Sequence, residues 1–126
     1  MRSYVLLCAI IFLNILHCFC NEKYTTAFDN VNVEEILSSE RLLNNYFKCM
    51  MDRGSCPPDA AELKRNLPDA LQTDCSKCSE KQKEVSKQIV KFLIEKKPNM
   101  WKELQEKYDP EQVYIKKFAQ HLDIKV

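Results

Sequence analysis

Seven cysteines are the residues of this 126-residue chain most able to do chemistry. Three lie within the first twenty residues, and the other four form the pattern Cys49-x6-Cys56-x18-Cys75-x2-Cys78. Four thiolates can hold zinc, but such sites ordinarily use two Cys-x2-Cys pairs, and this chain has one. A redox-active Cys-x2-Cys pair needs a thioredoxin-like βαβ setting, of which the sequence gives no sign. We therefore expect no metal site and no redox site, and interpret the four cysteines as two structural disulfides.

The four cysteines allow three pairings, and sequence alone does not choose among them. Cys75 and Cys78 can bridge directly, because residues three apart on a helix have Cα atoms roughly 5 to 5.5 Å apart, within the range that a disulfide spans. Cys49 and Cys56 would lie about 10 Å apart on a continuous helix, so their pairing requires a chain reversal. The spacing therefore favours two local disulfides, Cys49–Cys56 and Cys75–Cys78, over a crossed pairing.

The sequence between Cys49 and Cys56 contains a signal for such a reversal. Gly54 is the single glycine of the chain, and glycine is the residue best suited to end a helix in a left-handed cap. Pro57-Pro58 follows, which prevents the helix from resuming at once. We expect Gly54 to end the helix and so let the two cysteines meet.

Catalysis has little support elsewhere in the chain. After residue 20 the only histidine is His121, and a nucleophilic triad would need it beside a serine or cysteine. We expect His121 to be a solvated surface side chain. One glycine excludes a Gly-rich phosphate loop, and 19 Lys and Arg against 18 Asp and Glu leave no basic excess for nucleic acid. The sequence predicts a protein that is not an enzyme, needs no cofactor and binds no nucleic acid.

The first twenty residues are typical of a secretory signal peptide. Arg2 supplies a positive start, residues 5–19 are almost entirely apolar, and Cys18 and Cys20 place small residues before a cleavage site at Asn21. A membrane anchor is the alternative, but it needs about 20 mostly apolar residues, and polar residues follow this stretch at once. We expect residues 1–20 to be removed and residues 21–126 to form one secreted domain in an oxidising compartment.

The remaining chain predicts an all-α fold of about six short helices, because no segment alternates with the period of a strand. Residues 21–32 lack periodicity and are expected to form a loosely held arm, with Tyr24 and Phe28 as anchors. A short helix is expected at residues 33–37. Ser38 or Ser39 can cap a second, which carries an apolar stripe.

Two start signals predict two separate helices between Cys56 and Cys75. Asp59 followed by Glu62 is a capping box. Asn66 can cap the next helix, with Pro68 in its first turn, where the missing N–H is harmless. We expect the chain to break between these two helices.

The last three helices also have recognisable starts. Ser79 and Gln82 form a capping box for the longest helix, which runs to about Lys97, and Pro98 begins the next. Asp109 is the expected cap of the last helix, with a proline and a box residue following it at the required spacing.

The cysteine pattern C-x6-C-x18-C-x2-C resembles that of the insect chemosensory proteins, also called OS-D-like or pheromone-binding-like proteins. The resemblance covers nearly all of the chain after residue 20. It includes sequence blocks in the same order, namely Asp29-Asn30-Val31, Val33-Glu34-Glu35-Ile36-Leu37, Arg41-Leu42-Leu43-Asn44-Asn45-Tyr46, Leu67-Pro68-Asp69-Ala70-Leu71, Cys75-Ser76-Lys77-Cys78 and Lys107-Tyr108-Asp109-Pro110. The chain departs from the family at Ala27, where lysine is frequent, and at Pro57-Pro58-Asp59-Ala60, which replaces Thr-Pro-Glu-Gly.

The resemblance implies a compact six-helix bundle around an internal apolar channel, with the disulfides Cys49–Cys56 and Cys75–Cys78. It implies a monomeric carrier, secreted into sensillum lymph or haemolymph, for semiochemicals or fatty acyl compounds such as long-chain alcohols, esters and fatty acids. A membrane receptor is a candidate partner. Tyr46 is similar to a family tyrosine associated with the channel, and Trp101 to a tryptophan near its mouth. The residues expected at the ligand are Leu43, Tyr46, Phe47, Met50, Leu67, Leu71, Val85, Ile89, Phe92 and Trp101.

Two other roles compete with that of a carrier. Any one of these apolar residues is more simply interpreted as core than as ligand contact. The protein can also be a secreted developmental, immune or salivary interaction protein in which ligand carriage is incidental, since similar proteins are expressed outside sense organs. The tissue of expression would separate this function from chemosensation.

Overall fold

The computed structural model describes the backbone of residues 3–10 and 23–122, and side chains up to residue 120. Within these ranges the chain forms helices and no strand, which confirms the all-α class. Residues 3–10 form a short helix whose apolar side chains, Tyr4 and Leu7 among them, are exposed. The expected cleavage site before Asn21 lies outside the described residues. None of the described helices is long and apolar enough to cross a membrane.

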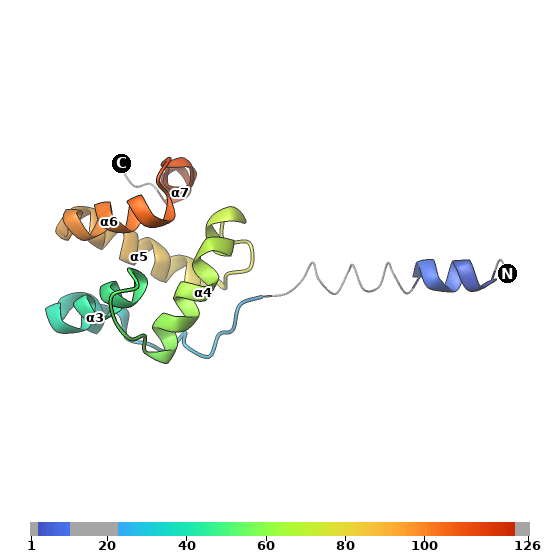
Figure 1. Cartoon of the computed structure of the whole chain (residues 1–126), viewed down its shortest axis with the longest axis horizontal. Coiled ribbons are helices and arrows are strands. Elements are labelled where there is room, and N and C mark those ends of the chain that lie inside the picture. The colour runs from blue at the N-terminus through green and yellow to red at the C-terminus, as the bar shows by residue number, and fades with distance from the viewer. Residues whose placement is uncertain (1–2, 11–22, 123–126) are drawn as a thin grey trace.

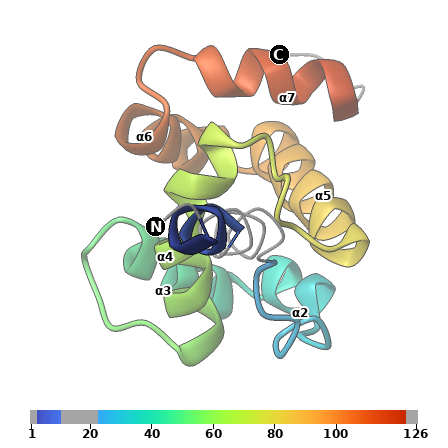
Figure 2. The ribbon, with the colours of Figure 1, turned by 90° about the vertical axis from the view of Figure 1, so that its right-hand side faces the viewer.

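Six further helices form the folded domain (Figure 1). They are α2 (Val33–Ser38), α3 (Glu40–Met50), α4 (Pro58–Gln72), α5 (Glu80–Lys96), α6 (Pro98–Tyr108) and α7 (Val113–Leu122). The closely packed pairs are α2 with α3, α3 with α4, α2 with α5 and α5 with α6. Figure 2 shows α6 and α7 at one end of the bundle, α2 and α3 at the other, and α4 and α5 running between them.

The apolar core is centred where α2, α3 and α5 meet. Leu37, Leu43 and Leu93, one from each of these helices, form its buried cluster. Partly buried side chains pack around them, namely Val33, Ile89, Phe92, Met100, Trp101 and Leu104. Burial of these apolar surfaces is the main favourable contribution to folding.

Several helix starts agree with the sequence analysis. Ser39 caps α3, because its side chain accepts a hydrogen bond from the backbone N–H of Leu42. Ser79 and Gln82 form the expected capping box at the start of α5. Pro98 occupies the first turn of α6. These predictions rest on local hydrogen bonds and on backbone geometry that the sequence alone encodes.

The expected break between a third and a fourth helix is wrong, because α4 is continuous and contains Pro68 in its interior. The helix begins at Pro58, one residue before the expected cap, and Pro57 precedes it without a side-chain hydrogen bond. Asn66 caps nothing; its side-chain amide instead donates to Glu62 within the helix, at 2.8 Å. A continuous α4 carries apolar residues from both predicted helices on one rigid element.

The end of α3 also differs from expectation, since the left-handed residue is Asp52 (φ 60°) and Gly54 has no positive φ. The N–H of Arg53 donates to the carbonyl of Lys48 at 2.8 Å, and the N–H of Asp52 to that of Cys49 at 3.2 Å. These two bonds form a Schellman cap with aspartate in place of glycine. At Gly54 a Cβ atom would lie 3.3 Å from the Cβ of Lys48, so the glycine permits a close approach instead.

Asp109 caps α7 from a greater distance than predicted. The helix begins at Val113, and Gln112, the expected box residue, has a φ of 60°. The buried Asp109 carboxylate accepts hydrogen bonds from the backbone N–H groups of Tyr114 (3.3 Å) and Ile115 (2.9 Å). The Asp109 side chain therefore supplies acceptors for the first N–H groups of α7, although a turn separates it from the helix.

Both preferred disulfides are present, Cys49–Cys56 with a Cα–Cα distance of 4.9 Å and Cys75–Cys78 with 5.1 Å. The spacing of Cys75 and Cys78 suggested a disulfide along a helix, but the two residues lie between α4 and α5. Their disulfide closes a turn after α4, in which Cys75 has a φ of 59° and its carbonyl accepts from the N–H of Cys78 at 3.0 Å. Each disulfide thus holds a turn at one end of α4.

Candidate functional site

The apolar residues expected at a ligand fall into two groups. Leu43, Ile89, Phe92 and Trp101 belong to or pack against the buried core cluster. The others lie outside that cluster, and all but the buried Met50 are half-buried, namely Tyr46, Phe47, Leu67, Leu71 and Val85. The structure therefore places the first four residues together and distributes the rest over α3, α4 and α5.

Helices α4 and α5 follow one another in the chain and are joined by the turn that the Cys75–Cys78 disulfide closes. They are not among the closely packed helix pairs, although each packs well against another helix. Leu67 and Leu71 on α4, and Val85 on α5, stay half-buried within the bundle. Ligand sites are lined mainly by apolar side chains and occur between the helices of bundles, so these residues are candidates for such a lining.

The Tyr46 hydroxyl links α3 to α4 by donating a hydrogen bond to the carboxylate of Asp59. Burial, together with the hydrogen bond and negative charge of Asp59, raises the pKa of Tyr46 to about 12. Its proton is therefore committed to Asp59, and the phenolic oxygen can offer a ligand an acceptor but no second donor. Sequence reasoning missed Asp59 as a partner because it assigned the residue to a helix cap.

Phe47 and Met50 lie at the end of α3, near charged side chains. The Arg53 guanidinium lies over the Phe47 ring, 5.8 Å from its centroid. The carbonyl of Met50 accepts from the Tyr108 hydroxyl at 2.5 Å and from the Lys107 ammonium at 2.9 Å. These contacts tie the end of α3 to α6.

Asp52 forms an ion-pair cluster after α3, where its carboxylate accepts from both Lys64 of α4 and Lys107 of α6. The hydrogen bond from Lys107 is the largest cause that lowers the pKa of Asp52 to about 2, followed by the one from Lys64. A neighbouring pair, Arg53 with Glu103 at 2.9 Å, joins the same loop to α6. The cluster fixes the turn that contains the Cys49–Cys56 disulfide.

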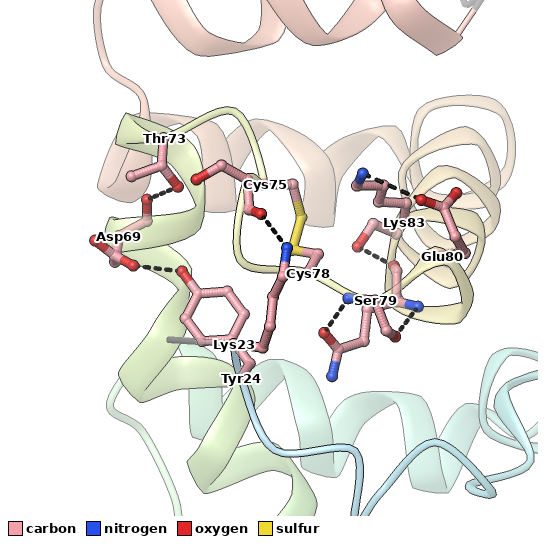
Figure 3. Close-up of a disulfide and its surroundings, with 12 residues drawn as sticks. Lys23, Tyr24, Asp69, Thr73, Cys75, Cys78, Ser79, Glu80 and Lys83 are labelled. Carbon is pink, nitrogen blue, oxygen red and sulfur yellow. Dashed lines mark hydrogen bonds and ion pairs between the residues drawn. A yellow bond between two sulfur atoms is a disulfide. The ribbon is translucent and has the colours of Figure 1, made fainter. Parts of the chain in front are cut away.

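The N-terminal arm is held more firmly than the sequence suggested. The Tyr24 hydroxyl donates to Asp69 of α4 at 2.5 Å, and the Tyr24 N–H donates to the carbonyl of Lys77 at 3.1 Å (Figure 3). Burial, then the hydrogen bond and charge of Asp69, raises the pKa of Tyr24 to about 12. Of the two expected anchors, Tyr24 is held by hydrogen bonds, whereas the Phe28 side chain is 37% exposed.

Little in the described part of the chain suggests catalysis. No group of His, Cys, Asp and Glu side chains among the described residues could hold a metal ion. The side chain of His121, the one histidine considered for a triad, lies outside the described residues. What the described residues offer is a set of apolar side chains with two tyrosine hydroxyls already bonded to carboxylates.

Comparisons with known proteins show the family and the fold to which the chain is similar. Residues 24–116 match the sequence model described as "Insect pheromone-binding family, A10/OS-D". The chain is 51% identical over 110 residues to Ejaculatory bulb-specific protein 3 of Drosophila melanogaster, covering 87% of each chain. It is 47% identical over 102 residues to Allergen Tha p 1 of Thaumetopoea pityocampa, covering 81% of each. A solved structure described as "Chemosensory Protein in Complex with bromo-dodecanol" superposes with a TM-score of 0.74 at 41% identity, covering 79% of this chain and 99% of that one.

Proposed function

The chain belongs to the insect pheromone-binding family A10/OS-D, and on that premise we propose that it is a secreted carrier for a long-chain apolar ligand. The ligand lies between α4 and α5, against the half-buried side chains of Leu67, Leu71 and Val85, and reaches the core residues around Trp101. The role is binding rather than catalysis, and it needs no cofactor. Its partner is a neutral or weakly polar molecule such as a long-chain alcohol, ester or fatty acid.

The observation that supports this proposal most strongly is the match to a chemosensory protein that holds bromo-dodecanol, at 41% identity and a TM-score of 0.74. In this chain, α4 and α5 are not closely packed together, and Leu67 and Leu71 of α4 and Val85 of α5 are only half-buried. Burial of ligand methylenes provides about 0.8 kcal/mol each, which is roughly a fourfold gain in affinity per added CH₂. A carrier of this kind should therefore discriminate by chain length.

Trp101 gives a direct assay, because it is the single tryptophan and packs against the core cluster. We expect linear alcohols, esters and acids of twelve to eighteen carbons to change its emission saturably or to displace a hydrophobic fluorescent probe. Affinity should rise with chain length by up to about fourfold per methylene until the space is filled. No saturable binding of any of these compounds would refute the proposal.

Two substitutions one helical turn apart in α4 locate the ligand. Leu67→Gln introduces a polar group at the proposed contact surface and should weaken binding at least about tenfold, since the amide is left without a partner against an apolar ligand. Leu63→Gln is the matched control, because Leu63 is 44% exposed on the same helix. Equal effects of the two substitutions would place the ligand elsewhere.

We further propose that the chain is monomeric, is released after removal of residues 1–20, and works in sensillum lymph or haemolymph, with a membrane receptor as a candidate recipient of the ligand. Two relatives favour a second role, because their names refer to an ejaculatory bulb and to an allergen rather than to a sense organ. In that case the chain is a secreted developmental, immune or salivary interaction protein. Transcript levels in antennae compared with glands and epidermis would decide between the two.

A further inference from the structure

The N-terminal arm, residues 23–31, bridges the two helices between which the proposed ligand lies. On the α4 side, the Tyr24 hydroxyl donates to Asp69 at 2.5 Å. On the α5 side, the Gln82 side-chain amide donates to the carbonyl of Thr25 at 2.9 Å, and the Ser79 hydroxyl donates to Asp29 at 3.3 Å. One short segment, distant in sequence from both helices, is thus fastened to the second half of α4 and to the start of α5.

Tyr24 is the side chain of the arm that reaches α4. Figure 3 shows its ring between α4 and the turn closed by the Cys75–Cys78 disulfide, with the hydroxyl directed at Asp69. The side chain is half-buried although it comes from a segment without secondary structure. The arm therefore places one partly buried aromatic ring between α4 and this turn.

The disulfide presents the remaining anchors of the arm. Two consecutive carbonyls of the turn accept from the arm, that of Lys77 from the N–H of Tyr24 at 3.1 Å and that of Ser76 from the Lys23 ammonium at 2.9 Å. Asp69 is in turn paired with the Lys77 ammonium at 3.2 Å. Because Cys75–Cys78 closes this turn, it fixes the carbonyls that hold the arm.

We propose that the arm is a gate to the ligand site between α4 and α5, at the end where the Cys75–Cys78 turn joins the two helices. Tyr24 is the side chain that closes the gate, and the turn supplies the carbonyls that hold the arm in place. The inference rests on the proposed carrier function. The arm crosses this end of α4 and α5, because it is hydrogen-bonded to Asp69 on one side and to Ser79 and Gln82 on the other. A ligand enters and leaves when the Tyr24 ring swings out, and the arm makes the same contacts whether the interior is empty or filled.

A gate of this kind predicts a kinetic effect without an effect on affinity. Tyr24→Phe removes the hydrogen bond to Asp69 and keeps the ring, and a bond to a charged group of this kind shifts an equilibrium roughly tenfold. We expect the association and dissociation rate constants of dodecanol, measured by stopped-flow fluorescence, to rise together by about that factor, and the equilibrium Kd to stay within about twofold. Asp29→Ala removes the acceptor for the Ser79 hydroxyl at the start of α5, and it should also raise both rate constants.

Tyr108→Phe is the matched control, because it also removes a tyrosine hydrogen bond of 2.5 Å, to the carbonyl of Met50, between α6 and α3. We expect its ligand rates to equal those of the unmodified protein. Hydrogen exchange of the Tyr24 amide, without ligand, should be faster in Tyr24→Phe and unchanged in Tyr108→Phe.

The possible failures are distinguishable. Equal rates in Tyr24→Phe and Tyr108→Phe would overturn the gate while leaving carriage intact. A faster dissociation with unchanged association would overturn it too, since Tyr24 would then be a ligand contact. No binding by the unmodified protein would overturn the carrier function itself, and the gate with it.

Discussion

Replacing Pro68 by alanine should stabilise the domain, although the same substitution at Pro98 should destabilise it. Pro68 lies in the interior of α4, which runs from Pro58 to Gln72. A proline there cannot donate a hydrogen bond to the carbonyl four residues earlier, that of Lys64, and its ring crowds the same carbonyl. Because Pro68 is exposed, the substitution removes little buried surface.

The size of the effect follows from the helix geometry. In host helices an interior proline is about 3 kcal/mol less favourable than alanine, and this is an upper limit because the native helix has already relaxed around the ring. Recovery of one backbone hydrogen bond alone provides about 0.5 to 1.5 kcal/mol. We therefore expect Pro68→Ala to raise the free energy of unfolding by about 1 to 3 kcal/mol. For a domain of this size each kcal/mol raises the melting temperature by about 4 °C or more.

Pro98→Ala is the matched control, since Pro98 occupies the first turn of α6, where its N–H would have no helical partner. Losing the fixed φ there enlarges the unfolded ensemble and should lower stability by about 0.4 to 1 kcal/mol. Urea denaturation followed by circular dichroism, with thermal melting as a second measure, gives both values. A neutral or destabilising Pro68→Ala, or two substitutions that act in the same direction, would refute this account of α4.

Two further predictions concern the charged side chains that fix the ends of helices. Asp109→Ala removes the acceptor for two backbone N–H groups of α7, so we expect chemical denaturation to show a loss of about 1 to 2 kcal/mol; an unchanged midpoint would mean that α7 starts without it. The pKa of Asp52 is lowered to about 2 by its two lysine partners, so its contribution to stability is present above about pH 4 and is lost as the pH falls towards 2. Asp52→Asn should therefore be less stable than the unmodified protein at pH 6, and the difference should shrink on acidification. A difference that is constant with pH would contradict the ion-pair assignment.

The helix starts that the sequence predicted correctly are those in which one polar side chain bonds to its own first turn. Ser39 and Ser79 do so, and Pro98 needs no partner at all. Such starts involve neighbours within three residues, so the local sequence contains all the necessary information. The two disulfides could be predicted for the same reason, because both join residues close in sequence.

The failed predictions each rested on a local signal, and at Asp59 and Asp52 the side chain instead bonds to another helix. Asp59 has the right spacing for a cap, but its carboxylate accepts from Tyr46 on another helix. Pro68 has the right sequence for a helix start, but α4 continues through it. Asp52 rather than Gly54 takes the left-handed conformation, and two lysines from other helices hold its side chain. Periodicity and capping rules weigh only the local alternative in each case.

The arm shows why part of the candidate site was beyond prediction. Residues 23–31 have no helical period, so sequence patterns assign them only to an irregular segment. Their partners lie about fifty positions away, on the turn that Cys75–Cys78 closes and on the helices either side of it. A disulfide between residues three apart contributes little as a cross-link, because the loop it closes is short. Its larger effect is geometric, since it fixes two carbonyls in the positions that hold a distant segment across the end of the bundle.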